Sequence, residues 1–430
     1  MYLFILGRQP EIGLVELRAV FNQAELILPQ VALVSSDKTP DIDRLGGVRK
    51  VGRVIYDNVG NPGQFLLDKF RDIPSGKITI GISHYGKTAS ATNAQKTAMF
   101  LKKNLERSVR ILPNSESEIS DAATLGNKLG SSPNKIELLM AHVGHHLIIA
   151  ELIGVQDLNS YTLRDRGRPK RDPRVGMLPP KLAQIMMNLA LGISSFRDFN
   201  FEDFSPSESE TYIPDDTDRF VRKDGSAGCP AYDVSETDGS EKLKSRKLRL
   251  LDPFCGTGVV LQEAALMGFG VYGTDIEPRM IDYTRTNLNW LAKQKTFELS
   301  NSPTFELTVA DATNCTWTSP IDLVATETYL GQPYTTTPPS EKLQQNITTC
   351  NTVISKFLLN LASQITPGAG LCIAVPCWFL NNKTYHLPLT HQLNAYGYEQ
   401  VFYSDDQKPL IYHREDQIVG RELLVLRKKS

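Results

Sequence analysis

The sequence predicts an α/β protein whose C-terminal half is built on an open, mainly parallel sheet and whose N-terminal half is a smaller α+β region. Three observations lead to this prediction. From Leu248 onward, apolar strands alternate with helical patterns, as in a parallel sheet covered on both faces. Residues 1–154 instead mix short strand-like and helix-like runs. A glycine-bearing turn after the first C-terminal strand opens a helix, as ligand-binding turns of such sheets do.

Size and composition narrow the class of protein. The chain has 430 residues, enough for two or three compact units that each bury a core. Since no apolar run reaches the roughly 18 residues of a bilayer span, no membrane association is expected. The six cysteines are scattered without a C-x-x-C pair, and the N-terminus has no basic segment before its short apolar stretch. A cytoplasmic protein with reduced thiols is therefore expected.

The N-terminal half divides by pattern into two units. Residues 2–7 predict a strand and Glu11–Phe21 a helix, and strand candidates at 31–35 and 53–59 complete a first unit over 1–74. A second unit over 75–156 begins with the strand-like KITIGISHYG and continues with a helix from about Ser90 to Glu106. The strand-like SVRILP and a paired run at 136–154 follow. Neither unit carries a catalytic signature.

Charge is concentrated in two segments near the middle of the chain. Residues 157–176 read as a basic linker, in which 164–174 hold six basic and two acidic residues. After it, a double proline opens a helix beginning KLAQIMMNLALG, which starts the last domain, 177–430. Residues 202–245 form an acidic insertion, expected to be irregular and mobile, with few large apolar residues. The basic linker is expected to contact phosphate. The alternative is that its charged side chains are only solvated by water.

The strongest motif is the turn DPFCGTG at 252–258, which follows the strand LRLL. Its two glycines allow a sharp turn and close approach of a ligand, and the next helix offers its N-terminal amides. The turn lacks the third glycine of a G-x-G-x-x-G dinucleotide motif, which disfavours a nicotinamide cofactor. The residues expected to bind a cofactor here are Asp252, Phe254, Cys255, Gly256, Thr257 and Gly258. Cys255 has no histidine or base at motif spacing, so its backbone rather than its thiol is expected to contribute.

Two further strand ends complete the predicted cofactor site. Asp275 ends the second strand, nineteen residues beyond Gly256, where a carboxylate can accept both hydroxyl protons of an adenosine ribose. Ile276 follows it directly, and Asp311 with Ala312 ends the third strand, where Asp311 is expected near the adenine edge. In open α/β sheets the carboxyl ends of strands are where ligands bind. The sequence thus predicts an adenosine-bearing ligand at this edge.

These motifs resemble the THUMP-domain tRNA guanosine-N2 methyltransferases of archaea and candidate-phylum organisms. MYLFILGRQPEIGLVELRAVF is similar to their ferredoxin-like N-terminal domain, and the unit ending SVRILPNSESEISDAATLGNKLG resembles a THUMP domain, which in that family holds the tRNA acceptor end. DPFCGTG with GTDIEPRMIDYTRTNL is the most specific block. The resemblance implies a Rossmann-like class I methyltransferase domain, S-adenosyl-L-methionine as cofactor, and methylation of the exocyclic N2 amine of a guanosine in tRNA.

One motif departs from the family pattern. Where the family has Asp-Pro-Pro-Tyr or a near variant after the fourth strand, this chain has TETYLG at 326–331. The resemblance implies that Glu327 takes the place of the acid, and that Glu327 and Tyr329 are the catalytic residues. An acidic oxygen can stabilise the positive charge that develops on the amine, and an aromatic ring can stack on an extruded base.

RNA binding is expected at basic side chains of the linker and of the second unit. Those predicted to contact phosphates are Arg164, Arg166, Arg168, Lys170, Arg171, Arg174, Lys102, Lys103, Arg107 and Arg110. No metal is predicted, because His142, His145 and His146 lack a cysteine or acidic partner at ligand spacing. Alternatives left open are a DNA adenine-N6 or ribosomal RNA guanine-N2 methyltransferase, and an inactive RNA-binding protein. Whether a partner subunit is needed is also open.

Overall fold

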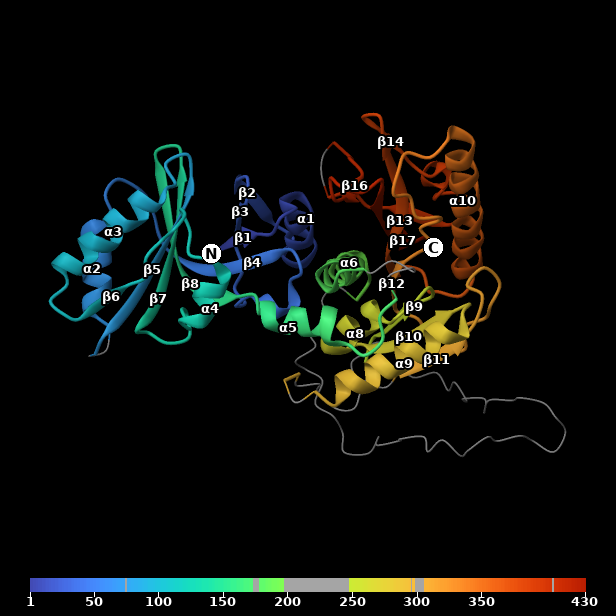
Figure 1. Ribbon diagram of the computed structural model, residues 1–430, viewed down its shortest axis with the longest axis horizontal. Helices are drawn as coiled ribbons and strands as arrows, with labels where there is room; N and C mark the ends of the chain where they lie inside the picture. Colours follow the sequence, from blue (N-terminus) through green and yellow to red (C-terminus); the bar gives the residue numbers. More distant parts are fainter. Residues whose placement is uncertain (74–75, 173–177, 197–246, 295, 298–304, 404–405) are drawn as a thin grey trace.

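The computed structural model describes residues 1–430 except 74–75, 173–177, 197–246, 295, 298–304 and 404–405, and consists of two sheets with helices packed on them (Figure 1). Arg174 and the acidic insertion 202–245 lie outside the described residues. No helix in the described ranges is both long enough and apolar enough to cross a membrane.

The N-terminal half contains one continuous sheet of eight strands. Their order is β2-β3-β1-β4-β8-β7-β5-β6. The strands are β1 (Tyr2–Leu6), β2 (Ala24–Leu28), β3 (Val31–Val34), β4 (Val48–Val59), β5 (Ile78–Gly86), β6 (Val109–Ile111), β7 (Lys135–Val143) and β8 (His146–Val155). Because β4 pairs with both β1 and β8, the two units expected at 1–74 and 75–156 share this sheet. The paired run predicted at 136–154 is the β7–β8 hairpin.

Short helices cover this sheet and connect it to the C-terminal half. They are α1 (Pro10–Phe21), η1 (Ile42–Arg44), α2 (Gly63–Arg71), α3 (Ala91–Asn104), α4 (Asp121–Gly126), α5 (Leu158–Thr162) and the π-helical turn η2 (Leu163–Gly167). The predicted helices at 11–21 and 90–106 correspond to α1 and α3. Ser90 caps α3 by accepting a hydrogen bond from the amide of Asn93, which fixes where the helix begins.

A buried ion pair joins β4 to β7 inside the N-terminal half. The ammonium of Lys50 lies 2.6 Å from a carboxylate oxygen of Glu137, and both side chains are 0% exposed. Lys50 also donates to the carbonyl of Ile119 at 2.6 Å. Glu137 accepts from the hydroxyls of Ser83 at 2.7 Å and Thr124 at 2.6 Å. These contacts satisfy the two buried charges and link both predicted units to one interior.

The C-terminal half contains the expected open, mainly parallel sheet. Its order is β11-β10-β9-β12-β13-β17-β15, with β14 on β13 and β16 on β17. The strands are β9 (Arg249–Asp252), β10 (Gly270–Asp275), β11 (Phe305–Val309), β12 (Leu323–Glu327), β13 (Gly370–Leu380), β14 (Lys383–Tyr385), β15 (Tyr398–Gln400), β16 (Leu410–Tyr412) and β17 (Val419–Lys428). Strands β9 to β13 run parallel, and β17 is antiparallel to β13. This confirms the predicted α/β class.

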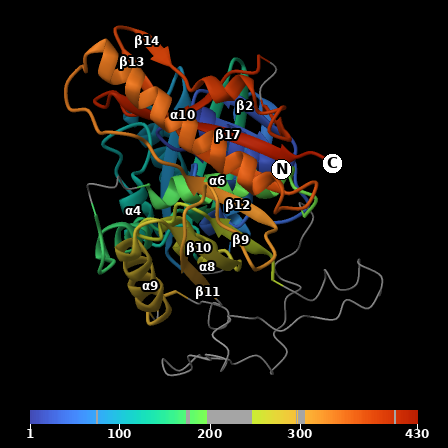
Figure 2. The ribbon, with the colours of Figure 1, turned by 90° about the vertical axis from the view of Figure 1, so that its right-hand side faces the viewer.

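Helices lie on both faces of the second sheet. They are α6 (Pro180–Ile193), α8 (Val259–Leu266), α9 (Pro278–Ala292), α10 (Ser340–Ala362) and the 3₁₀ turn η4 (Pro388–His391). Buried side chains of α6, α8 and α9 form one core with one face of the sheet, while α10 packs on the other face (Figure 2). The strand order reverses between β9 and β12, and in open α/β sheets ligands bind outside the carboxyl ends of the strands at such a point.

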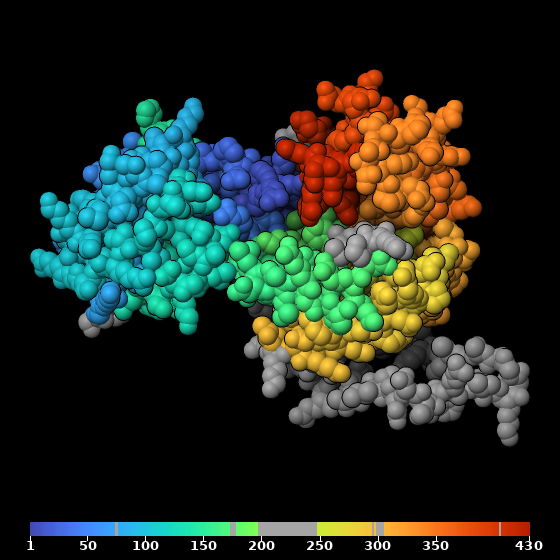
Figure 3. Space-filling view, in the orientation of Figure 1, coloured from blue at the N-terminus to red at the C-terminus, as the bar shows by residue number. Residues whose placement is uncertain are grey.

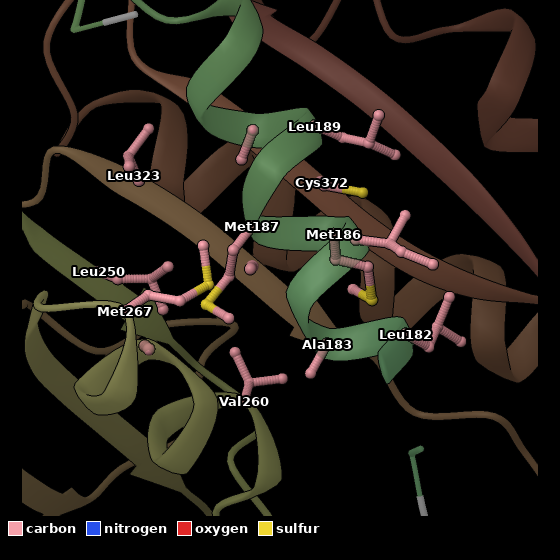
Figure 4. Packing of buried hydrophobic residues seen from close by; sticks show 14 of the residues in the cluster. Leu182, Ala183, Met186, Met187, Leu189, Leu250, Val260, Met267, Leu323 and Cys372 are labelled. Carbon is pink, nitrogen blue, oxygen red and sulfur yellow. The ribbon is translucent and has the colours of Figure 1, made fainter. Parts of the chain in front are cut away.

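Helix α6 joins the two halves. Its apolar side chains pack on β12, β13 and α8, with Met186 and Met187 directed into the core that contains Leu250 and Val260 (Figure 4). On the N-terminal side, Asn188 of α6 donates to the carboxylate of Glu16 on α1 at 2.7 Å. The segment that contains α5 fills the space between the halves on the surface (Figure 3). The two halves are therefore packed together through α6 rather than joined by a free linker.

Candidate active site

The glycine turn has the backbone conformation that its sequence predicts. Gly256 and Gly258 have φ of 51° and 81°, in the left-handed region that glycine adopts without a steric penalty. A side chain at Gly258 would also place its Cβ 2.8 Å from Cγ2 of Thr284. Thr284 itself donates to the carbonyl of Gly256 at 2.8 Å. The turn is thus held from α9 and requires glycine at Gly258 both for conformation and for space.

Asp275 ends β10 beside this turn. One of its carboxylate oxygens accepts a hydrogen bond from the amide of Gly256 at 2.9 Å, and the other accepts from the amide of Glu277 at 2.9 Å. Burial raises the pKa of this carboxyl, while the two amides act in the opposite direction. Ile276, the next residue, is 65% exposed. A carboxylate with free lone pairs next to an exposed apolar side chain suits a ligand that has both hydroxyl groups and an apolar ring, as an adenosine does.

The remaining predicted cofactor residues divide into surface and buried positions. Asp311 and Phe254 are half-buried, whereas Cys255, Thr257 and Ala312 are buried. Asp311 accepts from the amide of Thr313 at 2.9 Å and from its hydroxyl at 2.8 Å, which shapes the turn after β11. The amide of Cys255 donates to the carbonyl of Thr274 at 2.9 Å. Burial raises the pKa of the Cys255 thiol well above its usual value, so it is not a nucleophile.

Asp252 is buried at the carboxyl end of β9. The side chain is 2% exposed, and its carboxylate accepts from the hydroxyl of Thr326 at 2.6 Å and from the amide of Phe254 at 3.3 Å. Because Asp252 ends β9 and Thr326 lies in β12, this bond spans the point where the strand order reverses. Asp252 therefore links the two strand ends, and its predicted contact with the cofactor stays a prediction.

The burial of Asp252 leads to a pH-dependent prediction. Burial raises its pKa from 3.8 to about 7. Between these values the folded protein binds more protons than the unfolded chain, so the free energy of unfolding falls as pH rises from about 4 to about 7. We expect Asp252→Asn to reduce this dependence, measured by urea unfolding across that range, while Asp282→Asn on the exposed face of α9 leaves it unchanged. Equal pH dependence in wild type and Asp252→Asn would contradict this assignment. Burial also raises the pKa of Glu16 to about 7, so Glu16 accounts for the pH dependence of stability that remains in Asp252→Asn.

Glu327 and Tyr329 lie at the carboxyl end of β12. The Glu327 carboxylate forms an ion pair with Nε of Arg421 on β17, a residue that the sequence analysis did not identify. The Glu327 and Arg421 side chains are 14% and 11% exposed. Leu323 and Ala325 of β12 and Leu423 and Val425 of β17 belong to the core on the α6 face, so strand alternation puts Glu327 and Arg421 on that same face. Tyr329 is 36% exposed.

The loop after Glu327 is held in place without the prolines of the family motif. The amide and hydroxyl of Thr328 both donate to the carbonyl of Ala374 at 3.0 Å. Asn346 of α10 accepts from the amide of Gln332 at 3.1 Å. Gly331 has a φ of 78°, and a Cβ there would lie 2.2 Å from the Asn346 side chain. These hydrogen bonds hold the loop at Thr328 and Gln332, on either side of Tyr329 in the sequence.

The basic linker packs against the C-terminal half. As a result, two of its arginines that were predicted to contact phosphate are buried. Arg164 is 6% exposed and pairs with Glu263 of α8 at 2.7 Å. Arg168 is 3% exposed and lies in the interior. Both are inside because the segment packs across α8 and α9, so neither is available to a phosphate at the surface. Arg107 is also committed, since it donates to the carbonyls of Ile73 at 2.9 Å and Gly76 at 2.8 Å.

The other predicted phosphate contacts lie on the surface. Exposed residues of the linker are Arg166, Lys170 and Arg171, and those of the N-terminal half are Lys102, Lys103 and Arg110. The Lys170 ammonium lies 5.2 Å from the centre of the Tyr283 ring on α9, next to the glycine turn. Lys102 and Lys103 are in the last turn of α3. The linker and α3 thus present two separate basic surfaces.

Asn287 connects the linker to the glycine turn and was not predicted from the sequence. Its amide group donates to the carbonyl of Lys170 at 2.9 Å and to that of Thr257 at 2.8 Å, and it accepts from the amide of Lys170 at 2.9 Å. The side chain is 0% exposed. The signal in the sequence that could have indicated Asn287 is a polar side chain on the apolar face of a predicted amphipathic helix.

Comparison with known proteins identifies the C-terminal domain. Residues 244–412 match the family model described as a methyltransferase domain. A tRNA (guanine(10)-N2)-dimethyltransferase from Methanothermobacter thermautotrophicus is 34% identical over 129 residues, 30% of this chain and 33% of that protein. One of the same name from Pyrococcus abyssi is 51% identical over 41 residues, 10% of this chain and 12% of that protein. The chain thus aligns with at most about a third of these curated relatives.

Among solved structures, TrmN from Thermus thermophilus aligns over 99% of both chains with a TM-score of 0.48 and 14% identity. The domain match supports S-adenosylmethionine, the cofactor that the family resemblance implies. Residues 244–412 are therefore similar to a methyltransferase domain, and the two relatives that match this chain carry the name of the tRNA guanosine-N2 methyltransferases that its motifs resemble.

Proposed function

We propose that this protein transfers a methyl group from S-adenosylmethionine to the exocyclic N2 amine of a guanosine in tRNA. The single observation that carries the proposal is the position of Glu327, which ends β12 at the reversal of strand order, with Tyr329 two residues later. Both lie in the segment that matches the methyltransferase model. The names of the two archaeal relatives support guanosine N2 as the target.

The cofactor is proposed to lie along the carboxyl ends of β9, β10 and β11. Asp275 would accept the ribose hydroxyls, Ile276 would pack on the adenine, and the turn 256–258 would face the amino-acid part. Bound S-adenosylmethionine supplies an electrophilic methyl group. Since Asn287 holds the turn in place, it acts on this site through Thr257.

The acceptor amine is a poor nucleophile because its lone pair is delocalised into the purine ring. Glu327 is proposed to accept a hydrogen bond from the N2 amine, orienting its remaining lone pair toward the methyl group and stabilising the positive charge that develops on nitrogen. Tyr329, half exposed beside it, would stack on the base once it leaves its helix. Forming the new carbon–nitrogen bond would break the bond between the methyl carbon and the cofactor sulfur, leaving S-adenosylhomocysteine. N2 would lose one proton, and the Glu327 carboxylate is proposed to receive it.

The tRNA is proposed to contact the exposed basic residues on the linker and on α3. Lys170 is connected to the glycine turn through Asn287, and Arg166 and Arg171 belong to the same segment, whereas Lys102, Lys103 and Arg110 lie in the N-terminal half. Two separated basic surfaces suit a substrate that is long compared with one base, as a folded RNA is. A cytoplasmic location is proposed with this substrate.

The test is incubation of the purified protein with labelled S-adenosylmethionine and separate pools of tRNA, ribosomal RNA and DNA, followed by nucleoside analysis. We expect N2-methylated guanosine in tRNA only. Label in DNA adenine or in ribosomal RNA guanine would replace this proposal with one of those activities. Absence of label from all pools, with cofactor binding intact, would favour an RNA-binding protein without activity.

Asn287→Ala tests how the cofactor turn is supported. The substitution removes three hydrogen bonds that hold Lys170 and Thr257, so we expect S-adenosylhomocysteine to bind about 10-fold more weakly, equivalent to roughly 1.4 kcal/mol. Isothermal titration calorimetry measures this directly. Asn289→Ala, at an exposed position on the same helix, is the matched control and should bind normally. Unchanged affinity in Asn287→Ala would mean that the hydrogen bonds of Asn287 do not contribute to cofactor binding.

A further inference from the structure

We propose that Arg421 recognises the O6 atom of the target guanine and so selects guanine as the base. This inference rests on the proposed function, because it assigns a recognition residue for the same reaction. It begins from the ion pair between Arg421 and Glu327, which brings together two strand ends on the α6 face of the sheet.

The first step concerns which nitrogens of Arg421 are already engaged. Its Nε donates to Oε1 of Glu327. Within the described part of the chain, neither terminal guanidinium nitrogen of Arg421 has another hydrogen-bond partner, and neither is among the unpartnered atoms sealed from solvent. The guanidinium group has five donors in a rigid plane, so the pair with Glu327 leaves donors directed away from that bond.

The second step concerns Glu327. Its second carboxylate oxygen, Oε2, likewise has no protein partner among the described residues and is not sealed from solvent. The side chains thus present an acceptor and donors next to each other, held together by their ion pair. Both are mostly buried, which strengthens hydrogen bonds to a base that displaces water there.

The third step matches this pattern to a base. Along its Watson–Crick edge, guanine carries the N2 amine and the N1–H as donors, then O6 as an acceptor. If Glu327 accepts from the N2 amine and N1–H, a donor is needed for O6, and Arg421 is the charged donor beside Glu327. Arginine contacts to guanine oxygen are among the commonest specific contacts to a base.

The ion pair also gives Glu327 a positively charged neighbour next to the proposed base. A lone carboxylate next to O6 would repel it, whereas the guanidinium neutralises the acid and attracts the oxygen. Thr328 and Asn346 fix the adjacent loop, and β17 fixes Arg421, so both partners are held by rigid elements. Arg421 is therefore a specificity-determining residue, while Glu327 contacts the reacting amine.

The test compares guanosine with 6-thioguanosine at the methylated position of a tRNA transcript, because sulfur is a weaker acceptor while N1–H and the N2 amine remain. For the wild-type protein we expect kcat/KM to be about 10-fold to 100-fold lower with 6-thioguanosine. For Arg421→Met the two substrates should react within about 2-fold of each other, since the contact is already absent. Arg421→Lys, which retains a cationic donor, should recover part of the discrimination.

Arg427→Met is the matched control. Arg427 lies on the same strand and the same face as Arg421, but donates to the carbonyl of Ile193 at 2.9 Å and pairs with the exposed Glu399 at 3.3 Å. Arg427→Met should show the wild-type preference for the guanosine transcript over the 6-thioguanosine transcript. If Arg421→Met has no measurable turnover, the two transcripts are compared by their binding affinities instead. These affinities are measured with protein loaded with S-adenosylhomocysteine.

Two failures are distinguishable. If the wild-type protein forms no N2-methylguanosine, the proposed function itself is wrong. If it methylates guanosine but Arg421→Met retains the full wild-type preference for guanosine over 6-thioguanosine, in rate or in affinity, then Arg421 does not recognise O6 and this inference is overturned. Equal use of both transcripts by the wild type would overturn it as well.

Discussion

Replacing Glu327 with glutamine is expected to lower kcat for methyl transfer by about 10²-fold to 10³-fold, the effect of removing one charge-stabilising group from an active site. Glutamine keeps the length of the side chain but loses the negative charge that the methylated amine needs. It can still accept a hydrogen bond from Arg421, so the strand end should stay in place. Single-turnover rates with tRNA and labelled S-adenosylmethionine measure the loss.

Cofactor binding separates this catalytic role from a structural one. Glu327 is on β12, whereas Asp275 and the glycine turn are on β10 and after β9. Affinity for S-adenosylhomocysteine should therefore change by less than roughly 2-fold in Glu327→Gln, an energetic effect below RT. Glu341→Gln, at an exposed position in the first turn of α10, is the control for both measurements. A Glu327→Gln protein that turns over at the wild-type rate would remove Glu327 from the mechanism.

Replacing Lys50 with methionine is expected to lower the free energy of unfolding by about 3–5 kcal/mol, because it leaves Glu137 charged and uncompensated in the interior. Both side chains are 0% exposed, so water cannot solvate the remaining carboxylate. The double variant Lys50→Met/Glu137→Gln should recover much of the loss, since it removes the buried charge while a side-chain oxygen remains for Ser83 and Thr124. Chemical denaturation followed by circular dichroism measures each variant.

A surface pair provides the comparison for Lys50. Lys69 lies 2.9 Å from Glu151 with the two side chains 31% and 30% exposed. Lys69→Met should cost less than about 1 kcal/mol, the range of exposed ion pairs. If Lys50→Met were no more destabilising than Lys69→Met, the Lys50–Glu137 network would not stabilise the N-terminal half.

Features of the site that depend on neighbours in sequence were predictable. The two glycines of the turn require only a few consecutive residues, and Asp275 follows from the length of one helix and one strand. The parallel sheet also follows from the succession of strands and helices. In each case the physical cause is local, because backbone conformation and strand order depend on short-range patterns.

The outcome for the basic linker shows where that reasoning fails. A run of arginines predicts a phosphate-binding surface, yet Arg164 pairs with Glu263, 99 residues away in sequence. Likewise, the strand patterns at 1–74 and 75–156 did not indicate that β4 and β8 would pair across the boundary between them. Burial depends on what folds against a residue, and charge pattern alone does not contain that information.

The sequence by itself determined the glycine turn and the acid that ends the next strand, since those properties reside in the backbone freedom of glycine and in strand polarity. Only the tertiary structure decided which side chains meet around the acceptor site. Arg421 reaches Glu327 across 94 residues, and Asn287 reaches Lys170 across 117. Such contacts arise because strands order themselves in space independently of their order in the chain.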